Sequence, residues 1–384
     1  MSHLFPTYQR WEIEPVKGAG TILYDKAGKQ YLDFTSGIGV CNLVHRPEAV
    51  EHAVKEQLEL FWHVSNLFPQ SIQEKAAKKL AEGSGLGCVF FANSGAEANE
   101  AAIKLARKAT GRTKIITFLQ SFHGRTFAGM AATGQDKIKQ GFGSMLETFV
   151  HLPFNDLKAL KTEIDSDTAA VMIEIVQGEG GIHVVKNEFI KEAASVCAES
   201  GVLLIIDEIQ TGIGRTGKPF AFQHFGIEPD IITVAKGLGN GFPIGAAIGK
   251  AELAEFFGPG SHGSTFGGNP ISITAAIAVM DIIFKEEFLK EVSDKGILMF
   301  ELLNKELGCL EVVKEIRGLG LMTGIELTVG TQPILAELRQ SGLIALPAGE
   351  KVVRLLPPLN VTAKEIERAV SLMKKTISKS KVTA

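Results

Sequence analysis

The stretch CVFFANSGAEANEAAIKLARKAT (88–110) joins a short apolar run to a segment with the periodicity of a helix. Its opening, CVFFAN (88–93), has the length and composition of a buried strand. Apolar residues then recur on one face of a helix, at Ala98, Ala101, Ala102, Leu105 and Ala109. A strand that runs directly into an amphipathic helix is typical of α/β folds, so this unit predicts the fold class of the chain.

Four further apolar runs repeat the pattern: KIITF (114–118), AAVMIEIV (169–176), VLLIID (202–207) and DIITVA (230–235). Amphipathic segments separate several of them, which predicts a mainly parallel sheet flanked by helices. The pattern covers residues 48–284, which we expect to form a large domain. The two chain ends differ, with a hairpin pattern in TILYDKAGKQYLDF (21–34) and a mixed tail. Residues 1–47 and 285–384 are therefore expected to form a smaller α+β domain together.

The composition excludes several classes of function. Lys and Arg total 40 against 43 Asp and Glu, and no basic block stands out, so neither nucleic acid nor an anionic membrane is an expected partner. No apolar stretch approaches the ~20 residues of a membrane span, and the first residues lack a signal-peptide pattern. We expect a cytoplasmic protein that acts on small molecules. The four scattered cysteines predict reduced, mostly buried thiols and no metal ion.

The start of the helix after CVFFAN could bind an anion. Ser94 and Glu97 match the S-x-x-E pattern of a capping box. Gly95 and Ala96 lack bulk, so a phosphate could approach the free backbone N–H groups at the positive end of the helix dipole. The pattern alone also fits an ordinary helix start, because capping signals occur at many helices.

Two more chemical groups follow predicted strands. Asp207 ends VLLIID, and Lys236 follows DIITVA and precedes the glycine-rich GLGNGFPIG. Parallel strands present ligands at their carboxyl ends, so both groups are expected at one edge of the sheet. Either residue alone could be a capping or solvated charge. A carboxylate for a ring nitrogen, an amine for an aldehyde and a helix N-terminus for a phosphate are together what pyridoxal phosphate requires.

Long motifs in one order along the chain support this reading. They are FTSGIGVCNL (34–43), HVSNLF (63–68), NSGAEANEAAIKLARK (93–108), SFHGRT (121–126), IVQGEGG (175–181), LIIDEIQTGIGRTG (204–217), AKGLGNGFPIGA (235–246), HGSTFGGNP (262–270) and RLLPPL (354–359). Through them the chain resembles the class III, or ω-amino acid, pyridoxal-phosphate aminotransferases over nearly its whole length. The resemblance implies the type I fold of pyridoxal-phosphate transferases.

The resemblance also implies how the cofactor is held. Lys236 would be the lysine that forms a Schiff base with pyridoxal 5'-phosphate, and Asp207 would pair with its ring nitrogen. Gln210 would contact the phenolic oxygen, and Phe122 would cover the ring face. The phosphate would be held by Ser94, Gly95 and Ala96. Lys236 and Asp207 form the expected catalytic set.

The same resemblance implies substrate contacts and a homodimer. Arg125 would bind a substrate carboxylate, and Glu179 would mask Arg354 until glutamate arrives. Thr265 would reach the phosphate in the neighbouring subunit, and Ser264 would contact substrate across the interface. The active sites of the homodimer would therefore be shared.

The resemblance further implies the expected reaction: transamination between N2-acetyl-L-ornithine and 2-oxoglutarate, which gives N-acetyl-L-glutamate 5-semialdehyde and L-glutamate. In arginine biosynthesis it would run in reverse. Related enzymes that take free ornithine have a tyrosine where this chain has Ile38, and isoleucine offers no hydroxyl to a free ammonium. Ornithine, succinylornithine, succinyl-diaminopimelate and 4-aminobutyrate remain alternative amines, and racemases and aminomutases share the fold.

Two other classes of function are disfavoured. A non-catalytic pyridoxal-phosphate regulator would need an appended DNA-binding region, for which the chain has no spare length. A nicotinamide-dependent oxidoreductase would need G-x-G-x-x-G, which GLGNG does not match.

Two residues depart from the simple picture. Val44 stands where members of the family usually have glycine, which affects the expected geometry of that loop. His123 could be read as a catalytic base, but we expect a buried, hydrogen-bonded histidine near the ring because Lys236 suffices for proton transfer.

Overall fold

The computed structural model describes residues 2–379. Its largest sheet has seven strands in the order β4-β12-β11-β10-β7-β5-β6. Neighbouring strands pair in parallel except at β12, which runs antiparallel to β4 and β11. The strands are β4 (Cys88–Ala92), β5 (Lys114–Phe118), β6 (Phe149–Leu152), β7 (Thr168–Glu174), β10 (Leu203–Asp207), β11 (Ile231–Val234) and β12 (Gly245–Gly249). The predicted α/β class, with a mainly parallel sheet, is confirmed.

The five apolar runs in the sequence correspond to β4, β5, β7, β10 and β11, whereas β6 and β12 were not predicted. Strand β12 has the sequence GAAIG, whose small side chains do not form the apolar or β-branched run that predicts a strand. Its small residues have a packing reason. A Cβ atom added to Gly245 would lie 2.3 Å from the carbonyl oxygen of Ser94, so only glycine allows the start of α4 to approach this strand.

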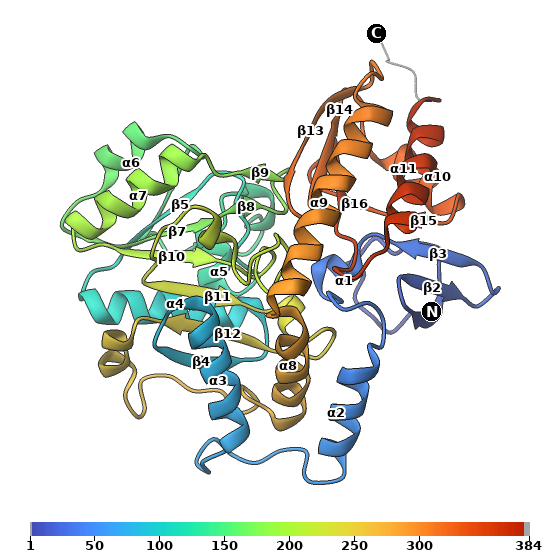
Figure 1. The fold of residues 1–384 in the computed structure, drawn as a ribbon. Helices are drawn as coiled ribbons and strands as arrows, with labels where there is room; N and C mark the ends of the chain where they lie inside the picture. Colours follow the sequence, from blue (N-terminus) through green and yellow to red (C-terminus); the bar gives the residue numbers. More distant parts are fainter. Residues whose placement is uncertain (1, 380–384) are drawn as a thin grey trace.

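Helices cover both faces of the large sheet. Side chains alternate between faces along a strand, so Ile205 and Ile206 on β10 point in opposite directions. Ile205 packs in the same cluster as Leu105 of α4 (Gly95–Thr110), and Ile206 packs with Ile190 of α7 (Asn187–Glu199). Helices α4 and α7 therefore lie on opposite faces of the sheet (Figure 1).

Helix α4 begins where the sequence predicted, but only half of the capping box is formed. The Ser94 hydroxyl accepts a hydrogen bond from the Glu97 N–H at 3.2 Å. The Glu97 carboxylate accepts from the backbone and side-chain nitrogens of Asn93 instead of from Ser94. The N–H groups of Gly95 and Ala96 at the helix start have no intrahelical acceptor, as in any α-helix.

Both chain ends build the smaller lobe, where Figure 1 shows the blue and red elements together. One sheet, in the order β1-β2-β3-β15, contains the predicted hairpin, and β15 pairs in parallel with β3 across the two chain ends. A second sheet has the order β13-β14-β17-β16. The strands are β1 (Pro15–Ala19), β2 (Ile22–Asp25), β3 (Gln30–Asp33), β13 (Val313–Leu319), β14 (Met322–Leu327), β15 (Leu343–Ile344), β16 (Leu346–Pro347) and β17 (Val352–Leu355).

Long helices connect and cover the two lobes. Helix α9 (Glu286–Leu307) follows α8 (Pro270–Ile283) and leads into the smaller lobe, where it packs against α11 (Ala363–Ile377). The other helices are α1 (Ser36–Gly39), α2 (Glu48–Leu58), α3 (Ser71–Ser84), α5 (Phe127–Ala132), α6 (Leu157–Glu163) and α10 (Gln332–Gln340). Short elements are η1 (Asp136–Ile138), η2 (Ala221–His224), η3 (Lys236–Leu238), η4 (Ala251–Phe257), β8 (Val176–Gln177) and β9 (His183–Val184). The domain limits at residues 48 and 284 stay a prediction.

The cysteines are free thiols, as expected, but the expectation that most are buried was wrong. Cys197 is buried, Cys41 and Cys88 are partly exposed, and Cys309 is exposed. No helix within residues 2–379 is long and apolar enough to span a bilayer.

Candidate active site

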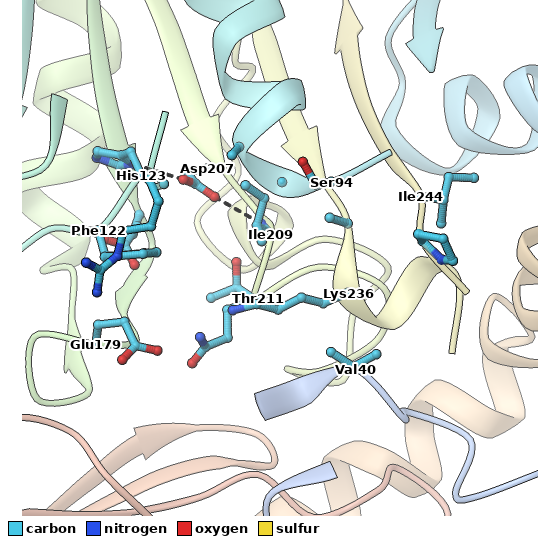
Figure 2. Close-up of a pocket in the computed structure, with 18 of the residues that line it drawn as sticks. Val40, Ser94, Phe122, His123, Glu179, Asp207, Ile209, Thr211, Lys236 and Ile244 are labelled. Carbon is cyan, nitrogen blue, oxygen red and sulfur yellow. Dashed lines mark hydrogen bonds and ion pairs between the residues drawn. The ribbon is translucent and has the colours of Figure 1, made fainter. Parts of the chain in front are cut away.

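A cavity of about 420 Å³ lies at the carboxyl ends of β7, β10 and β11 and at the start of α4. It brings together residues from distant parts of the sequence. The sequence-predicted residues that line it are Ser94, Gly95, Ala96, Phe122, Arg125, Glu179, Asp207, Gln210 and Lys236. Figure 2 shows Phe122, Glu179, Asp207 and Lys236 arranged around this space.

Asp207 is held by three donors. Its Oδ2 accepts from Asn99 Nδ2 at 2.9 Å. The same oxygen lies 2.8 Å from His123 Nδ1, and Oδ1 accepts from the Ile209 N–H (Figure 2). Burial lowers the pKa of His123, but the hydrogen bond and charge of Asp207 outweigh it, and the net pKa is raised. The contact with His123 is one of three that hold the Asp207 carboxylate in place. His123 is thus a buried histidine bonded to Asp207, as the sequence analysis expected.

Lys236 lies in an unusual backbone conformation at the end of β11. Its φ angle is 41°, in the left-handed region, and Asn240 in the following turn is also left-handed, with φ 47°. Burial lowers the pKa of the Lys236 ammonium, and the charge of Arg354 acts in the same direction, while Glu179 opposes it. A lowered pKa increases the fraction of neutral amine, the form that can attack an aldehyde.

The start of α4 packs closely against two neighbouring segments of the cavity wall. A Cβ atom on Gly95 would lie 2.7 Å from the Ile209 side chain, and one on Gly124 would lie 3.1 Å from Ala96 Cβ. Glycine at these two positions therefore lets Ile209 and the Gly124 backbone pack directly against the start of the helix. Gly95 and Ala96 themselves line the cavity, where a phosphate could meet their N–H groups.

Arg354, on β17 in the smaller lobe, is not among the residues that line the cavity, but it contacts two that are, Glu179 and Gln210. Its Nη1 donates to Glu179 Oε1 at 2.7 Å, to the Gly178 carbonyl at 2.9 Å and to Gln210 Oε1 at 3.1 Å. Burial would raise the pKa of Glu179, but the charge and hydrogen bond of Arg354 lower it overall. The structure therefore joins Glu179 and Arg354 in an ion pair, and Gln210 belongs to the same network.

Arg125 lies at the edge of the cavity with its guanidinium 5.6 Å from the centre of the Phe122 ring. It is exposed, so its charge is available to a carboxylate that enters from solvent.

Ser264 and Thr265 do not line the cavity that contains Lys236. They line a second cavity of about 410 Å³ with His63, Ser65, Asn66, Leu67 and Gly263. Asn66 Nδ2 donates to the carbonyls of Ser264 and Gly267, which ties the two loops together. Within this chain, therefore, Thr265 is not placed with the residues around Lys236.

The sequence analysis missed one acidic residue in the cavity wall. Glu174, at the end of β7, is 7% exposed, and burial raises the pKa of its carboxyl group to about 7. A signal was present, because a glutamate within the apolar run AAVMIEIV is a buried charge that needs partners. Val40, which also lines the cavity, gave no such signal.

The geometry defines a class of protein: a two-lobed α/β enzyme with a lysine, a carboxylate and a helix N-terminus around one cavity. The aminotransferase class-III family model matches residues 6–377, and the chain belongs to this family. Acetylornithine aminotransferase of Bacillus subtilis (strain 168) is 61% identical over 379 residues, with 98% of each chain covered.

Solved structures agree with this assignment. Ornithine aminotransferase from Toxoplasma gondii ME49 superposes with a TM-score of 0.94 at 31% identity and covers 98% of this chain and 92% of its own. N-acetylornithine aminotransferase from Stenotrophomonas maltophilia K279a has a TM-score of 0.84 at 34% identity, with 97% of each chain covered. The chain is a pyridoxal-phosphate-dependent aminotransferase, and the groups around its cavity fit that cofactor.

Proposed function

We propose that this enzyme transfers the δ-amino group of N2-acetyl-L-ornithine to 2-oxoglutarate and so gives N-acetyl-L-glutamate 5-semialdehyde and L-glutamate. In arginine biosynthesis the reaction runs in reverse, and we place it in the cytoplasm. The observation that carries the proposal is the cavity lined by Lys236, Asp207 and Glu179, behind which Arg354 is paired with Glu179. The acetylornithine aminotransferase from B. subtilis, at 61% identity, supports this choice of substrate.

The chain's own residues account for the chemistry. Bound pyridoxal phosphate would supply an electron-withdrawing ring next to the reacting carbon. Lys236 would hold the cofactor, and its neutral Nζ would take and return the proton of the substrate carbon. Asp207, supported by His123, would hold a proton on the ring nitrogen. The N–H groups of Gly95 and Ala96 would bind the phosphate.

Two arginines would bind substrate carboxylates. Arg125, at the exposed edge of the cavity, would bind the carboxylate of either substrate. Arg354 is paired with Glu179, so it would be available to a second carboxylate only after this pair opens. Glutamate and 2-oxoglutarate have two carboxylates, whereas acetylornithine has one. The Arg354–Glu179 pair would therefore open for glutamate or 2-oxoglutarate and stay closed for acetylornithine.

The test is a half-reaction followed by absorbance. Purified holoenzyme is mixed with one amine at a time, and conversion of the cofactor to its amine form is recorded. We expect N2-acetyl-L-ornithine to react with the highest kcat/KM among acetylornithine, ornithine, succinylornithine, succinyl-diaminopimelate and 4-aminobutyrate. A higher value for any of the other amines would assign the enzyme to a different branch of the family.

A homodimer with shared sites is part of the proposal. Large apolar side chains are exposed on the segment before α3 and on the loop that carries Thr265: Leu58, Leu60, Phe61, Trp62, Leu67, Phe68 and Phe266. Asn66 ties the two segments together, and large apolar side chains exposed on adjacent segments commonly mark an interface. A second copy that covers it would bring Thr265 to the phosphate of its partner's cofactor.

Mixed dimers test the shared site. One subunit carries Lys236→Ala and the other Thr265→Ala. If Thr265 acts across the interface, one site has both residues intact, and the mixed dimer keeps about half of the wild-type activity. If Thr265 acts within its own chain, both sites are impaired, because loss of a hydrogen bond to phosphate weakens cofactor binding roughly 10–150-fold.

A further inference from the structure

Glu174 connects two loops of the cavity wall, one that contains Phe122 and one that contains Gly178 and Glu179. It is the last residue of β7, and its side chain is buried. Its Oε1 accepts from the Phe122 N–H at 2.9 Å, and its Oε2 accepts from the Gly178 N–H at 3.2 Å. Each carboxylate oxygen therefore serves a different loop.

Both loops carry residues of the site. Phe122 lines the cavity directly. Gly178 precedes Glu179, and its carbonyl accepts from Arg354 Nη1 at 2.9 Å. A Cβ atom on Gly178 would lie 2.3 Å from Gln210 Oε1, so this backbone has almost no freedom to shift toward Gln210. A small displacement of the Gly178 N–H would therefore change the contacts of Arg354.

A carboxylate suits this position better than an isosteric amide. Two N–H donors that face one side chain require two acceptor atoms, and a carboxyl group has two oxygens that can accept. Glutamine offers one acceptor, so its amide nitrogen would face an N–H group and leave that buried donor unpaired. To give this N–H group another acceptor, one of the two loops would have to move away from residue 174.

We propose that Glu174 is a positioning residue that fixes the loop containing Phe122 relative to the loop containing Glu179. By doing so it sets the ratio of the two half-reaction rates. The second part rests on the proposed function. When the Glu179 loop loosens, Glu179 pairs less well with Arg354, and the arginine becomes more available to glutamate. The acetylornithine half-reaction, which needs the arginine masked, then loses relative to the glutamate half-reaction.

Glu208 provides a matched control. It is a second buried glutamate, burial raises the pKa of its carboxyl group to about 7 as well, and its Oε1 accepts from the Phe222 N–H at 2.8 Å while Oε2 accepts from the Thr211 hydroxyl. It is not among the residues that line the cavity. Glu208→Gln therefore measures how replacing a buried glutamate by glutamine outside the cavity wall affects hydrogen exchange and the half-reaction rates.

The experiment compares wild type, Glu174→Gln and Glu208→Gln as holoenzymes. Amide hydrogen exchange is measured by mass spectrometry on peptides that cover 119–126 and 175–182, and both half-reactions are followed by absorbance. Glu174→Gln should speed exchange in at least one of these peptides about 10–100-fold, the effect of leaving a buried N–H donor without an acceptor. The glutamate-to-acetylornithine ratio of kcat/KM should rise about tenfold or more. Glu208→Gln should leave both peptides and the ratio near wild type.

Wild-type exchange in both peptides of Glu174→Gln would overturn the positioning role, whichever amine the enzyme prefers. Faster exchange with an unchanged ratio would overturn the effect on the half-reactions. If wild type does not use acetylornithine, the proposed function fails, and the exchange data still test the positioning role. Should Glu174→Gln not fold, Glu174→Asp replaces it. The shorter side chain cannot bond to both loops, so only one of the two peptides should exchange faster than in wild type. Wild-type exchange rates in both peptides would contradict the proposal.

Discussion

Nη1 of Arg354 lies 2.7 Å from Oε1 of Glu179, and the two side chains differ in exposure, at 2% and 33%. The arginine is also held by the Gly178 carbonyl and by Gln210, so it keeps two acceptors when the glutamate leaves. The more exposed partner is therefore the one with room to move. The pair can open toward an incoming carboxylate without displacing Arg354.

Glu179→Ala should unmask Arg354. Glutamate would then bind without first breaking an ion pair, and acetylornithine would be misplaced by attraction of its carboxylate to the free arginine. We expect the glutamate-to-acetylornithine ratio of half-reaction kcat/KM to rise at least about tenfold, in line with measured couplings of close charge pairs. Single-turnover absorbance measurements give the ratio. A ratio equal to that of wild type would make Glu179 a structural residue.

Lys236→Ala should abolish covalent retention of the cofactor. The purified variant should lose its cofactor on denaturation after borohydride treatment, whereas wild type keeps a reduced label on the peptide that contains Lys236. Turnover should fall at least ~10²-fold, because the positioned base is lost as well. Lys250→Ala is the control, since Lys250 is paired with Asp230. A label on another lysine of the wild-type enzyme would refute the assignment.

Val44→Gly should stabilise the protein. Val44 has a φ angle of 65°, in the left-handed region that β-branched residues avoid. Relief of this strain should raise the free energy of unfolding by about 1–2 kcal/mol. The greater conformational entropy of glycine in the unfolded chain should lower it again by about 0.5–1 kcal/mol. Thermal unfolding should show a rise in Tm of a few degrees at most. Val16→Gly, at an exposed strand position with ordinary φ, should lower Tm; a fall in both variants would contradict the strain argument.

His45 should make stability depend on pH. Its Nε2 lies 2.9 Å from Asp33 Oδ2, and hydrogen bonds to Asp33 and Cys41 raise the pKa of His45 to about 9 from 6.5. Because the folded-state pKa is raised, the stabilisation is complete below about pH 6.5 and is lost as the pH rises through about 9. The difference in Tm between wild type and His45→Gln should shrink from pH 6 to pH 9.5. A difference that is constant over this range would show that the histidine is not charged in the folded protein.

Ile38→Tyr should shift the preference toward free ornithine. Ile38 is 42% exposed next to Val40, which lines the cavity, and it has a left-handed φ of 68°. Tyrosine supplies a hydroxyl to a free α-ammonium, which isoleucine leaves uncompensated. We expect the acetylornithine-to-ornithine ratio of kcat/KM to be about 100 for wild type. In the variant this ratio should be at least about tenfold lower. Ile38→Phe, which lacks the hydroxyl, is the control and should not gain ornithine activity.

The sequence by itself determined the elements whose signals are local. Helix α4 begins at Gly95 and ends at Thr110 as its apolar period and small first residues predicted, and five apolar runs became strands of the large sheet. Asp207 and Lys236 became candidates for the same reason, because Asp207 ends one such run and Lys236 directly follows another. Local patterns suffice where a residue's environment is set by its neighbours along the chain.

The tertiary structure alone decided the features that join distant segments. Strand β12 is inserted antiparallel between β4 and β11, and its glycine-rich sequence gave no sign of this. The resemblance to a family suggested that Glu179 and Arg354 meet, but no pattern in the chain places them 2.7 Å apart across 175 residues. Nor did the run AAVMIEIV show that the two oxygens of Glu174 would serve two different loops. Such contacts depend on which faces the sheet and the two lobes bring together, and the free energy of burying a charge is settled only by the partners it finds there.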